Sequence, residues 1–129
     1  MKYAIDASVL VDHLRNHAPA VDLIDRLITE DAQFVSSFVI RAEVLAGMRR
    51  GEEDRTMKLL GLVEWELVGE PESDAAGALG RRYVPANVGI DTPDLFLAEV
   101  ANRHGAEVLT MNVKHFREMF PEIQAPYSY

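Results

Sequence analysis

Hydrophobic and polar positions repeat with two periods along the chain, and these periods predict strands alternating with helices. Short apolar runs, typical of buried strands, occupy residues 2–6, 33–36, 63–68 and 107–110. Between them, apolar residues spaced three or four apart predict helices with one buried face over residues 9–16, 19–28, 37–49, 52–62, 71–83, 93–104 and 113–119. This order predicts an α/β fold, in which a central, mostly parallel sheet is flanked by helices on both faces.

Several helix ends carry residues that favour a boundary. Thr92 suits the N-cap of the sixth predicted helix, Pro93 suits its first turn and Gly105 its end. Ser8 suits the N-cap of the first helix, and Gly51 the end of the third. In a parallel α/β sheet the functional site lies beyond the carboxyl ends of the strands.

Composition narrows the chemistry of such a site. A chain of 129 residues, 48% hydrophobic and 26% charged, is expected to form one domain over residues 1–129. Without cysteine it has no thiolate ligands, and 21 Asp and Glu residues favour oxygen ligands, which suit Mg²⁺ or Mn²⁺ better than Zn²⁺. No apolar stretch approaches the roughly 20 residues of a membrane span, and the first residues predict a strand and a helix rather than a signal peptide. We therefore expect a cytoplasmic protein without a membrane contact.

The net charge of −8 opposes general affinity for nucleic acid, because the summed field repels phosphate. Any nuclease activity must therefore depend on local chemistry. Six basic residues could form a local patch or could be scattered and solvated, and the sequence leaves both possibilities open: Arg49, Arg50, Arg81, Arg82, Arg103 and Lys114.

Three acids stand where burial is expected. Asp6 closes an apolar strand, and Asp94 heads a helical stripe that should face the core. Glu43 has only apolar or small neighbours three and four residues away, so we expect it on a core-facing side. A buried carboxylate is costly unless a cation compensates it, and divalent cations relieve the repulsion between clustered acids. The acids therefore predict metal-assisted chemistry, such as cleavage of a phosphodiester by an activated water.

Each acid also has a purely structural interpretation. Asp6 could cap the first helix, and Asp94 could complement the positive end of its helix. Asp91 is a weaker candidate because it lies in the preceding turn, and Asp12 is expected to be solvated or salt-bridged. The prediction of a site depends on three such positions occurring together in one small domain.

Three segments, in this order and spacing, resemble the PIN-domain ribonucleases, and in particular the VapC-type toxins of toxin–antitoxin pairs. The segments are YAIDASVLVD at residues 3–12, SSFVIRAEVLAG at 36–47 and DTPDLFLAEVANRHGAEVLTMNVKHF at 91–116. The resemblance covers nearly the whole chain. It implies a PIN-like three-layer α/β/α domain and a metal-dependent endoribonuclease.

The resemblance also implies roles for individual residues. Asp6, Glu43 and Asp94 would hold Mg²⁺ or Mn²⁺, Ser8 would support Asp6, and Asn112 would orient water or metal. The amide of Asn112 brings no full charge, so one firmly held metal is expected rather than two. Two departures are that Met111 stands where the family often has Arg, and that Asp91 matches no family ligand position.

The partners implied by the resemblance are an RNA substrate, a cognate antitoxin whose C-terminal segment covers the acidic groove, and a second copy of the chain in a homodimer. One alternative is a catalytically silent PIN-fold module that binds other proteins. A phosphatase or receiver-like domain using Asp6 as nucleophile is disfavoured, because Ala7 and Ser8 occupy the places where such domains carry a second acid.

Overall fold

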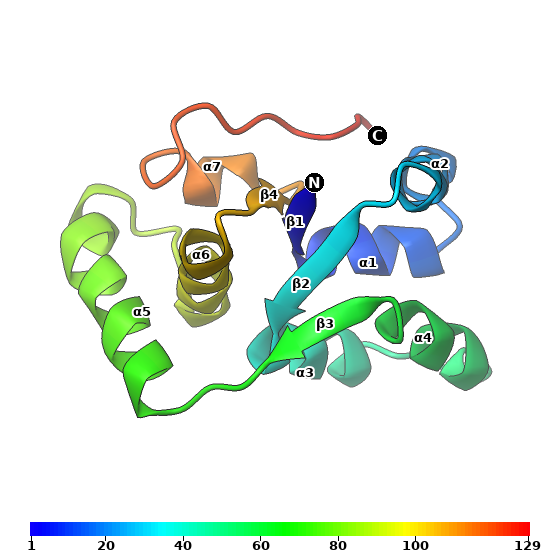
Figure 1. The fold of residues 1–129 in the computed structure, drawn as a ribbon, viewed down its shortest axis with the longest axis horizontal. Coiled ribbons are helices and arrows are strands. Elements are labelled where there is room, and N and C mark those ends of the chain that lie inside the picture. Colours follow the sequence, from blue (N-terminus) through cyan, green and yellow to red (C-terminus); the bar gives the residue numbers. More distant parts are fainter.

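The computed structural model describes all residues 1–129 and contains four strands, seven α-helices and one short 3-10 helix (Figure 1). In chain order the elements are β1 (Lys2–Ile5), α1 (Ala7–Leu14), α2 (Ala18–Thr29), β2 (Gln33–Ser37), α3 (Phe38–Ala46), α4 (Glu53–Leu60), β3 (Val63–Glu66), α5 (Glu70–Tyr83), the 3-10 helix η1 (Val84–Ala86), α6 (Thr92–His104), β4 (Glu107–Leu109) and α7 (Val113–Phe116). Every predicted strand and helix is present, so the predicted α/β class is confirmed.

The four strands form one parallel sheet in the order β3-β2-β1-β4. From β1 the chain moves to β2 and then to β3, each time to the adjacent position. After β3 it crosses back and adds β4 on the other side of β1. The direction of winding therefore reverses between β1 and β4, and this is the point in an open α/β sheet where binding sites form.

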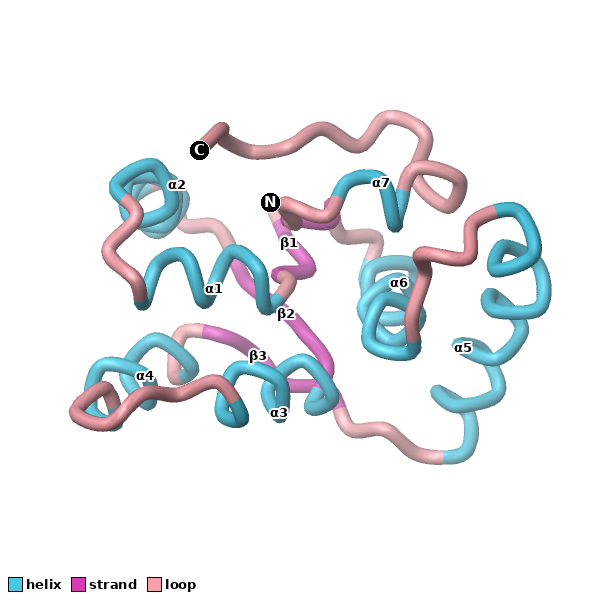
Figure 2. The backbone as a smooth tube through the Cα atoms, turned by 180° about the vertical axis from the view of Figure 1, so that it is seen from behind, coloured by secondary structure: helices cyan, strands magenta, loops and turns pink.

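Helices cover both faces of the sheet and produce three layers. In Figures 1 and 2, α1, α2 and α4 lie on one side, whereas α6 lies on the other with α5 outside it. Successive strand residues point to opposite faces: Ile5 and Leu109 belong to the core cluster under α1 and α2, and Ala4 and Val108 to the one under α6. Both faces are buried, which explains why the strands are apolar runs without alternation.

Several predicted boundaries are wrong by two or three residues, including both ends of the first helix, which is Ala7–Leu14 rather than 9–16. Three predicted elements extend too far for a reason that the structure shows. Helix α3 ends at its C-cap Gly47, and Gly51, with φ of +87°, lies in the loop that follows. Strand β3 ends at Glu66, because β2, its only partner, ends at the register position opposite. Helix α7 ends at Phe116 in a turn that Phe120 closes through its backbone N–H. In each case the sequence pattern is longer than the backbone pairing that supports the element.

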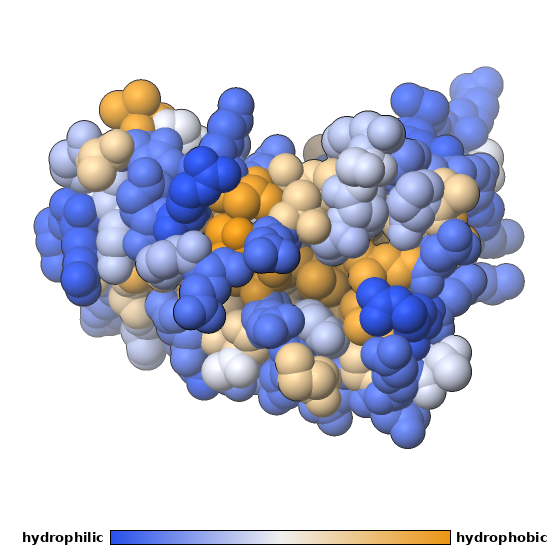
Figure 3. Space-filling view, turned by 90° about the horizontal axis from the view of Figure 1, so that it is seen from above, coloured by the Kyte–Doolittle hydropathy of each residue, from blue (hydrophilic) through white to orange (hydrophobic).

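A hollow of about 820 Å³ lies between α2, the edge strand β4 and the segment that follows α7. Figure 3, which views the molecule from above, shows hydrophobic residues at the bottom of a hollow between hydrophilic flanks. None of the helices has the length and apolar composition needed to cross a membrane.

Replacing Leu97 by Ala tests the core under α6. The Leu97 side chain is fully buried, so Leu97→Ala should lower the free energy of unfolding by about 2–5 kcal/mol through lost burial and a residual cavity. Leu67→Ala is the matched control, because Leu67 is 75% exposed and its loss should change stability by less than about 0.5 kcal/mol. Urea denaturation measures both, and equal effects would contradict this assignment of the core.

Candidate acidic active site

Asp6 lies where β1 ends, between β4 and the start of α1. Its backbone N–H donates to the carbonyl of Leu109 at 2.9 Å, which extends the pairing of β1 with β4 by one residue. Its Oδ1 accepts a hydrogen bond from the backbone N–H of Ala7 at 2.8 Å, so Asp6 is the N-cap of α1. The prediction that Ser8 caps this helix is therefore wrong, because the helix begins at Ala7.

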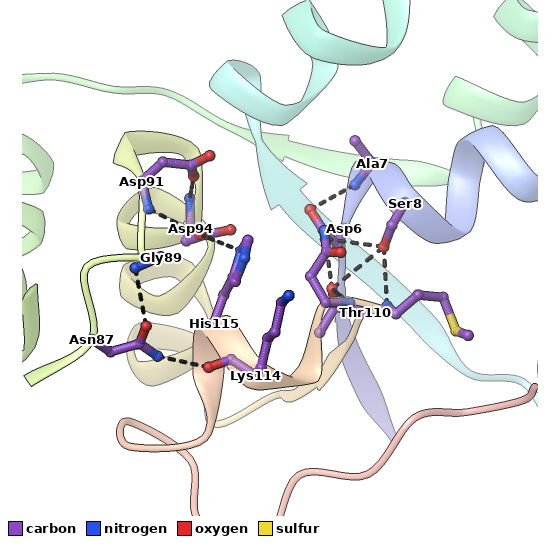
Figure 4. Close-up of polar contacts among 12 residues, drawn as sticks. Asp6, Ala7, Ser8, Asn87, Gly89, Asp91, Asp94, Thr110, Lys114 and His115 are labelled. Atoms are coloured by element: carbon purple, nitrogen blue, oxygen red, sulfur yellow. Dashed lines mark hydrogen bonds and ion pairs between the residues drawn. The ribbon is translucent and has the colours of Figure 1, made fainter.

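Two hydroxyl groups hold the other oxygen of Asp6 (Figure 4). Ser8 Oγ donates to Oδ2 at 3.0 Å, and Thr110 Oγ1 donates to the same atom at 2.6 Å. Each hydroxyl in turn accepts a backbone N–H: Ser8 from Met111 at 3.0 Å, and Thr110 from Asn112 at 3.0 Å. Asp6, only 4% exposed, is therefore fixed from both β1 and β4.

Thr110 is the residue of this group that sequence reasoning missed. It is fully buried and its hydroxyl bridges Asp6 and the turn that carries Asn112. A hydroxyl residue directly after the last apolar strand was the available signal, because that position shares the sheet edge with Asp6. Burial raises the pKa of Asp6, while the hydrogen bonds from Thr110, Ser8 and Ala7 oppose the rise by favouring the charged form.

Asp91 and Asp94 form a reciprocal pair at the start of α6. Asp94 N–H donates to Asp91 Oδ1 at 3.2 Å, and Asp91 N–H donates to Asp94 Oδ2 at 3.0 Å. This is a capping box, so the N-cap is Asp91 and the prediction of Thr92 is wrong by one residue. As predicted, Asp94 heads the buried stripe that continues with Leu97 and Ala98, and it is 5% exposed.

His115 of α7 lies opposite Asp94, with its Nδ1 3.1 Å from Asp94 Oδ2. This nitrogen is buried and its contact with Asp94 does not have the geometry of a hydrogen bond. Asn87 fixes the loop before Asp91 against α7, because its amide donates to the Lys114 carbonyl at 2.7 Å. Neither His115 nor Asn87 was predicted, since each acts through a contact that no sequence period reveals.

Glu43 lies on α3 with an exposed side chain, so the prediction that it faces the core is wrong. The core-facing residues of α3 are Ile40 and Val44, and Glu43 instead borders the space in front of Asp6. Partial desolvation, followed by the charges of Asp6 and Asp91, raises the pKa of Glu43. The Glu43 carboxylate thus interacts electrostatically with the other acids of the site although its side chain is exposed.

The acids surround one cavity of about 330 Å³. All five predicted site residues line it, together with six others, the complete lining being Asp6, Ala7, Ser8, Val11, Asp12, Glu43, Asp91, Asp94, Asn112, His115 and Tyr129. Asp91, left undecided by the sequence, is therefore at the cavity. Asp12 was expected to be solvated or salt-bridged, but it accepts hydrogen bonds from two tyrosines.

The basic residues do not gather at this cavity. Arg49 and Arg50 lie in the loop after α3, and Arg81 and Arg82 lie at the end of α5, on the other side of the molecule (Figure 2). Arg103 is paired with Glu99 and Glu66 on α6 and β3. Lys114 lies between Asn112 and His115 in the sequence, both of which line the cavity, but Lys114 itself does not line it. Figure 4 shows its side chain next to His115.

The donor atoms of the cavity suit a hard cation. Its polar lining consists mainly of carboxylates, with one amide and one imidazole, and no sulfur. Burial or mutual repulsion raises the pKa of Asp6, Glu43 and Asp94, and a divalent cation would relieve both effects. No three His, Asp or Glu side chains converge closely enough to bind one ion directly, so these side chains alone do not form a complete metal site.

The fold and this edge of the sheet define a PIN-type α/β/α domain, and comparison with known proteins identifies the family. The PIN domain family model matches residues 3–119, so the chain belongs to the PIN-domain family. Ribonuclease VapC19 of Mycobacterium tuberculosis is 39% identical over 123 residues, covering 95% of this chain and 98% of that protein. Ribonuclease VapC10 of the same organism is 30% identical over 124 residues, covering 96% of this chain and 92% of that protein.

Solved structures share the fold. A toxin–antitoxin complex from Klebsiella pneumoniae superimposes with a TM-score of 0.81 at 22% identity, covering all of both chains. VapBC-1 from nontypeable Haemophilus influenzae gives a TM-score of 0.75 at 21% identity and 98% coverage of both chains. The three-layer PIN-like architecture expected from the sequence is therefore confirmed.

The stability of the protein should depend on the protonation of Asp94. Burial raises the pKa of Asp94 from its ordinary 3.8 to about 7, so the folded chain holds this proton at a pH where the unfolded chain has lost it. The charge of Asp94 therefore lowers stability as the pH rises from about 4 to about 7. Relative to the parent protein, Asp94→Asn should gain in melting temperature across this range, measured in chelator.

Asp74→Asn is the control for this experiment, because Asp74 is an exposed acid on α5 outside the cavity. The melting-temperature difference between Asp74→Asn and the parent should not vary across the same pH range. A difference for Asp94→Asn that is equally independent of pH would contradict the assignment.

Proposed function

We propose that this protein is a metal-dependent endoribonuclease and the toxin of a VapBC-like toxin–antitoxin pair. The observation that carries the proposal is the convergence of acids from β1, α3 and the start of α6 on one cavity at the switch point of the sheet. Membership of the PIN-domain family and identity to proteins named ribonuclease VapC support the same activity. A cytoplasmic location accompanies this proposal.

The carboxylates Asp6, Glu43 and Asp94 would hold Mg²⁺ or Mn²⁺. Bound there, such an ion supplies a water of lowered pKa and neutralises charge on the phosphate. Ser8 and Thr110 favour the charged form of Asp6 and fix its orientation, since both donate to its Oδ2. Asp91 orients Asp94 through the capping box, and Asn112, on the cavity wall, offers an amide that can both donate to and accept from water.

The proposed protein partners are a cognate antitoxin and a second copy of the chain. Support for an antitoxin comes from the relatives of the same fold, which were solved as toxin–antitoxin complexes. Charge supports it too: a cavity bordered by five carboxylates and a net charge of −8 favour a basic segment as the inhibitor.

Substitution of the central acids should abolish RNA cleavage. Asp6→Asn and Asp94→Asn each remove a charge that would hold the metal, so kcat/KM should fall by roughly 10²- to 10³-fold. Cleavage of total RNA by the purified chain, with Mg²⁺ or Mn²⁺ and then with excess chelator, measures this. Asp74→Asn changes the charge equally outside the cavity and should cut like the parent.

Two results would count against this activity. Cleavage by Asp6→Asn and Asp94→Asn at the parent's rate would refute the assignment of the site. The alternative, a silent PIN-fold module that binds proteins, has some support from Asn112 and from the spacing of the acids. It would be favoured if Mn²⁺ shifted neither the melting temperature nor the activity of the parent.

Induced expression tests the role as a toxin. In a bacterial host the parent chain should arrest growth, whereas Asp6→Asn should be tolerated at equal protein level. Co-expression of the adjacent reading frame should restore growth by supplying the antitoxin. Growth arrest that persists with Asp6→Asn would show that toxicity does not depend on the acidic cavity.

A further inference from the structure

An aromatic cluster, formed by His17, Tyr127 and Tyr129, borders the acidic cavity on the side of α1. The hydroxyl of Tyr127 donates to Asp12 Oδ2 at 2.6 Å, and the hydroxyl of Tyr129 donates to the same oxygen at 2.8 Å. Asp12 and Tyr129 both belong to the cavity lining, together with Asp6. One carboxylate oxygen therefore fixes two aromatic rings beside the acids.

The three rings support one another. Tyr127 and Tyr129 meet edge to face, with centroids 6.2 Å apart and planes at 84°. The His17 ring lies 5.4 Å from the ring of Tyr127 and 5.1 Å from that of Tyr129. Such contacts are favourable, but they leave Tyr129 80% exposed although its hydroxyl is anchored. The cluster thus presents an oriented aromatic surface to solvent at the cavity.

The two tyrosines also determine where residues 124–129 lie. In Figure 1 the chain leaves α7 and runs over the sheet toward α1 and α2. Residues 124–129 make no backbone–backbone hydrogen bond, the last such bond being from Ile123 to Phe120. The bonds of Tyr127 and Tyr129 to Asp12 are the hydrogen bonds that attach this segment to the body. The segment is therefore placed by its aromatic side chains rather than by strand pairing.

The charge of the chain limits how RNA can be bound. With a net charge of −8 and few cations beside the cavity, phosphate contacts contribute little affinity. Proteins that bind single-stranded RNA gain affinity instead by stacking unpaired bases on aromatic rings. At this cavity Tyr129 is the lining residue with an exposed aromatic ring.

We propose that the aromatic cluster is a nucleobase-binding subsite, in which an unpaired base beside the phosphate at the acidic cavity stacks on Tyr129. Asp12 is then a positioning residue that holds the two tyrosine rings, and His17 and Tyr127 support Tyr129 from behind. The subsite selects single-stranded or looped RNA, because a base held in a duplex cannot reach the ring. This inference depends on the proposed function for its RNA substrate.

Equilibrium binding tests the subsite independently of cleavage. The full chain, in chelator, is titrated into a short fluorescein-labelled single-stranded RNA and followed by anisotropy. Tyr129→Leu should weaken binding by roughly tenfold, whereas Tyr129→Phe keeps the ring, loses only its hydrogen bond to Asp12 and should weaken binding less than Tyr129→Leu. Asp12→Ala changes no aromatic residue but removes the acceptor that holds both tyrosine rings, so it should also weaken RNA binding. Tyr83→Leu removes a tyrosine from α5, outside the cavity, and should bind like the parent.

An RNA of the same length with abasic nucleotides throughout separates stacking from other effects. The parent should bind it roughly tenfold more weakly than normal RNA, and Tyr129→Leu should cause no further loss. In cleavage assays Tyr129→Leu should raise KM and leave kcat close to the parent value. Unchanged affinity of Tyr129→Leu for normal RNA, or an equal loss on abasic RNA, would overturn the subsite.

The outcomes for the subsite and for the nuclease are distinguishable. Cleavage that needs Asp6, with RNA binding indifferent to Tyr129→Leu, would refute the subsite and leave the nuclease. Binding that depends on Tyr129, without metal-dependent cleavage, would support the subsite and refute the nuclease. Absence of RNA binding by the parent would overturn the subsite directly.

Discussion

The carboxylate of Asp6 is the constraint on which the site depends. Through its backbone it closes the pairing of β1 with β4, and through Oδ1 it caps α1. Through Oδ2 it binds the hydroxyls of Ser8 and Thr110, which lie on opposite sides of the switch point. Because the reversal of the chain makes β1 and β4 neighbours, residues about a hundred positions apart share this one acid. The hydrogen bonds of Asp6 therefore stabilise both the sheet and the site.

Asp6 and Asp94 are both buried, but they meet different surroundings. Asp6 accepts three hydrogen bonds, from Ala7, Ser8 and Thr110, and each favours its charged form. Asp94 accepts one backbone hydrogen bond, from Asp91, whose own charge opposes ionisation. Burial can therefore raise the pKa of Asp94 to about 7. The charge of Asp94 is therefore costly to the folded chain, and a nearby cation would reduce that cost.

Much of the fold could be predicted from the sequence, because both faces of the sheet are covered. Doubly buried strands give continuous apolar runs, and Asp6 and Asn112 stood out as the polar residues that end two of them. The prediction failed for Glu43, since four apolar or small neighbours on a short helix do not tell which side of it meets the core. Here Ile40 and Val44 do.

The parts of the site that could not be predicted from the sequence are made by contacts between particular side chains, most of them distant along the chain. Thr110 gains its role only because β4 lies beside β1, and Asp91 only because a capping box turns it toward Asp94. Asp12 was expected to be solvated or salt-bridged, and its two tyrosine partners lie 115 and 117 residues away. The local pattern of apolar residues cannot reveal such distant pairs, whereas the order of strands in the sheet predicts some of them.

The charge balance of the cavity also bears on how the proposed substrate would bind. Five carboxylates, those of Asp6, Asp12, Glu43, Asp91 and Asp94, border a space that would receive a phosphate. These charges oppose the approach of a phosphate, and a cation held among them would reduce that repulsion. Asn112 on the same wall carries an amide, which adds polar atoms to the lining without adding a sixth negative charge. A cation bound here would therefore first offset the charge of the lining itself, and the proposed affinity for RNA would depend on contacts to the bases.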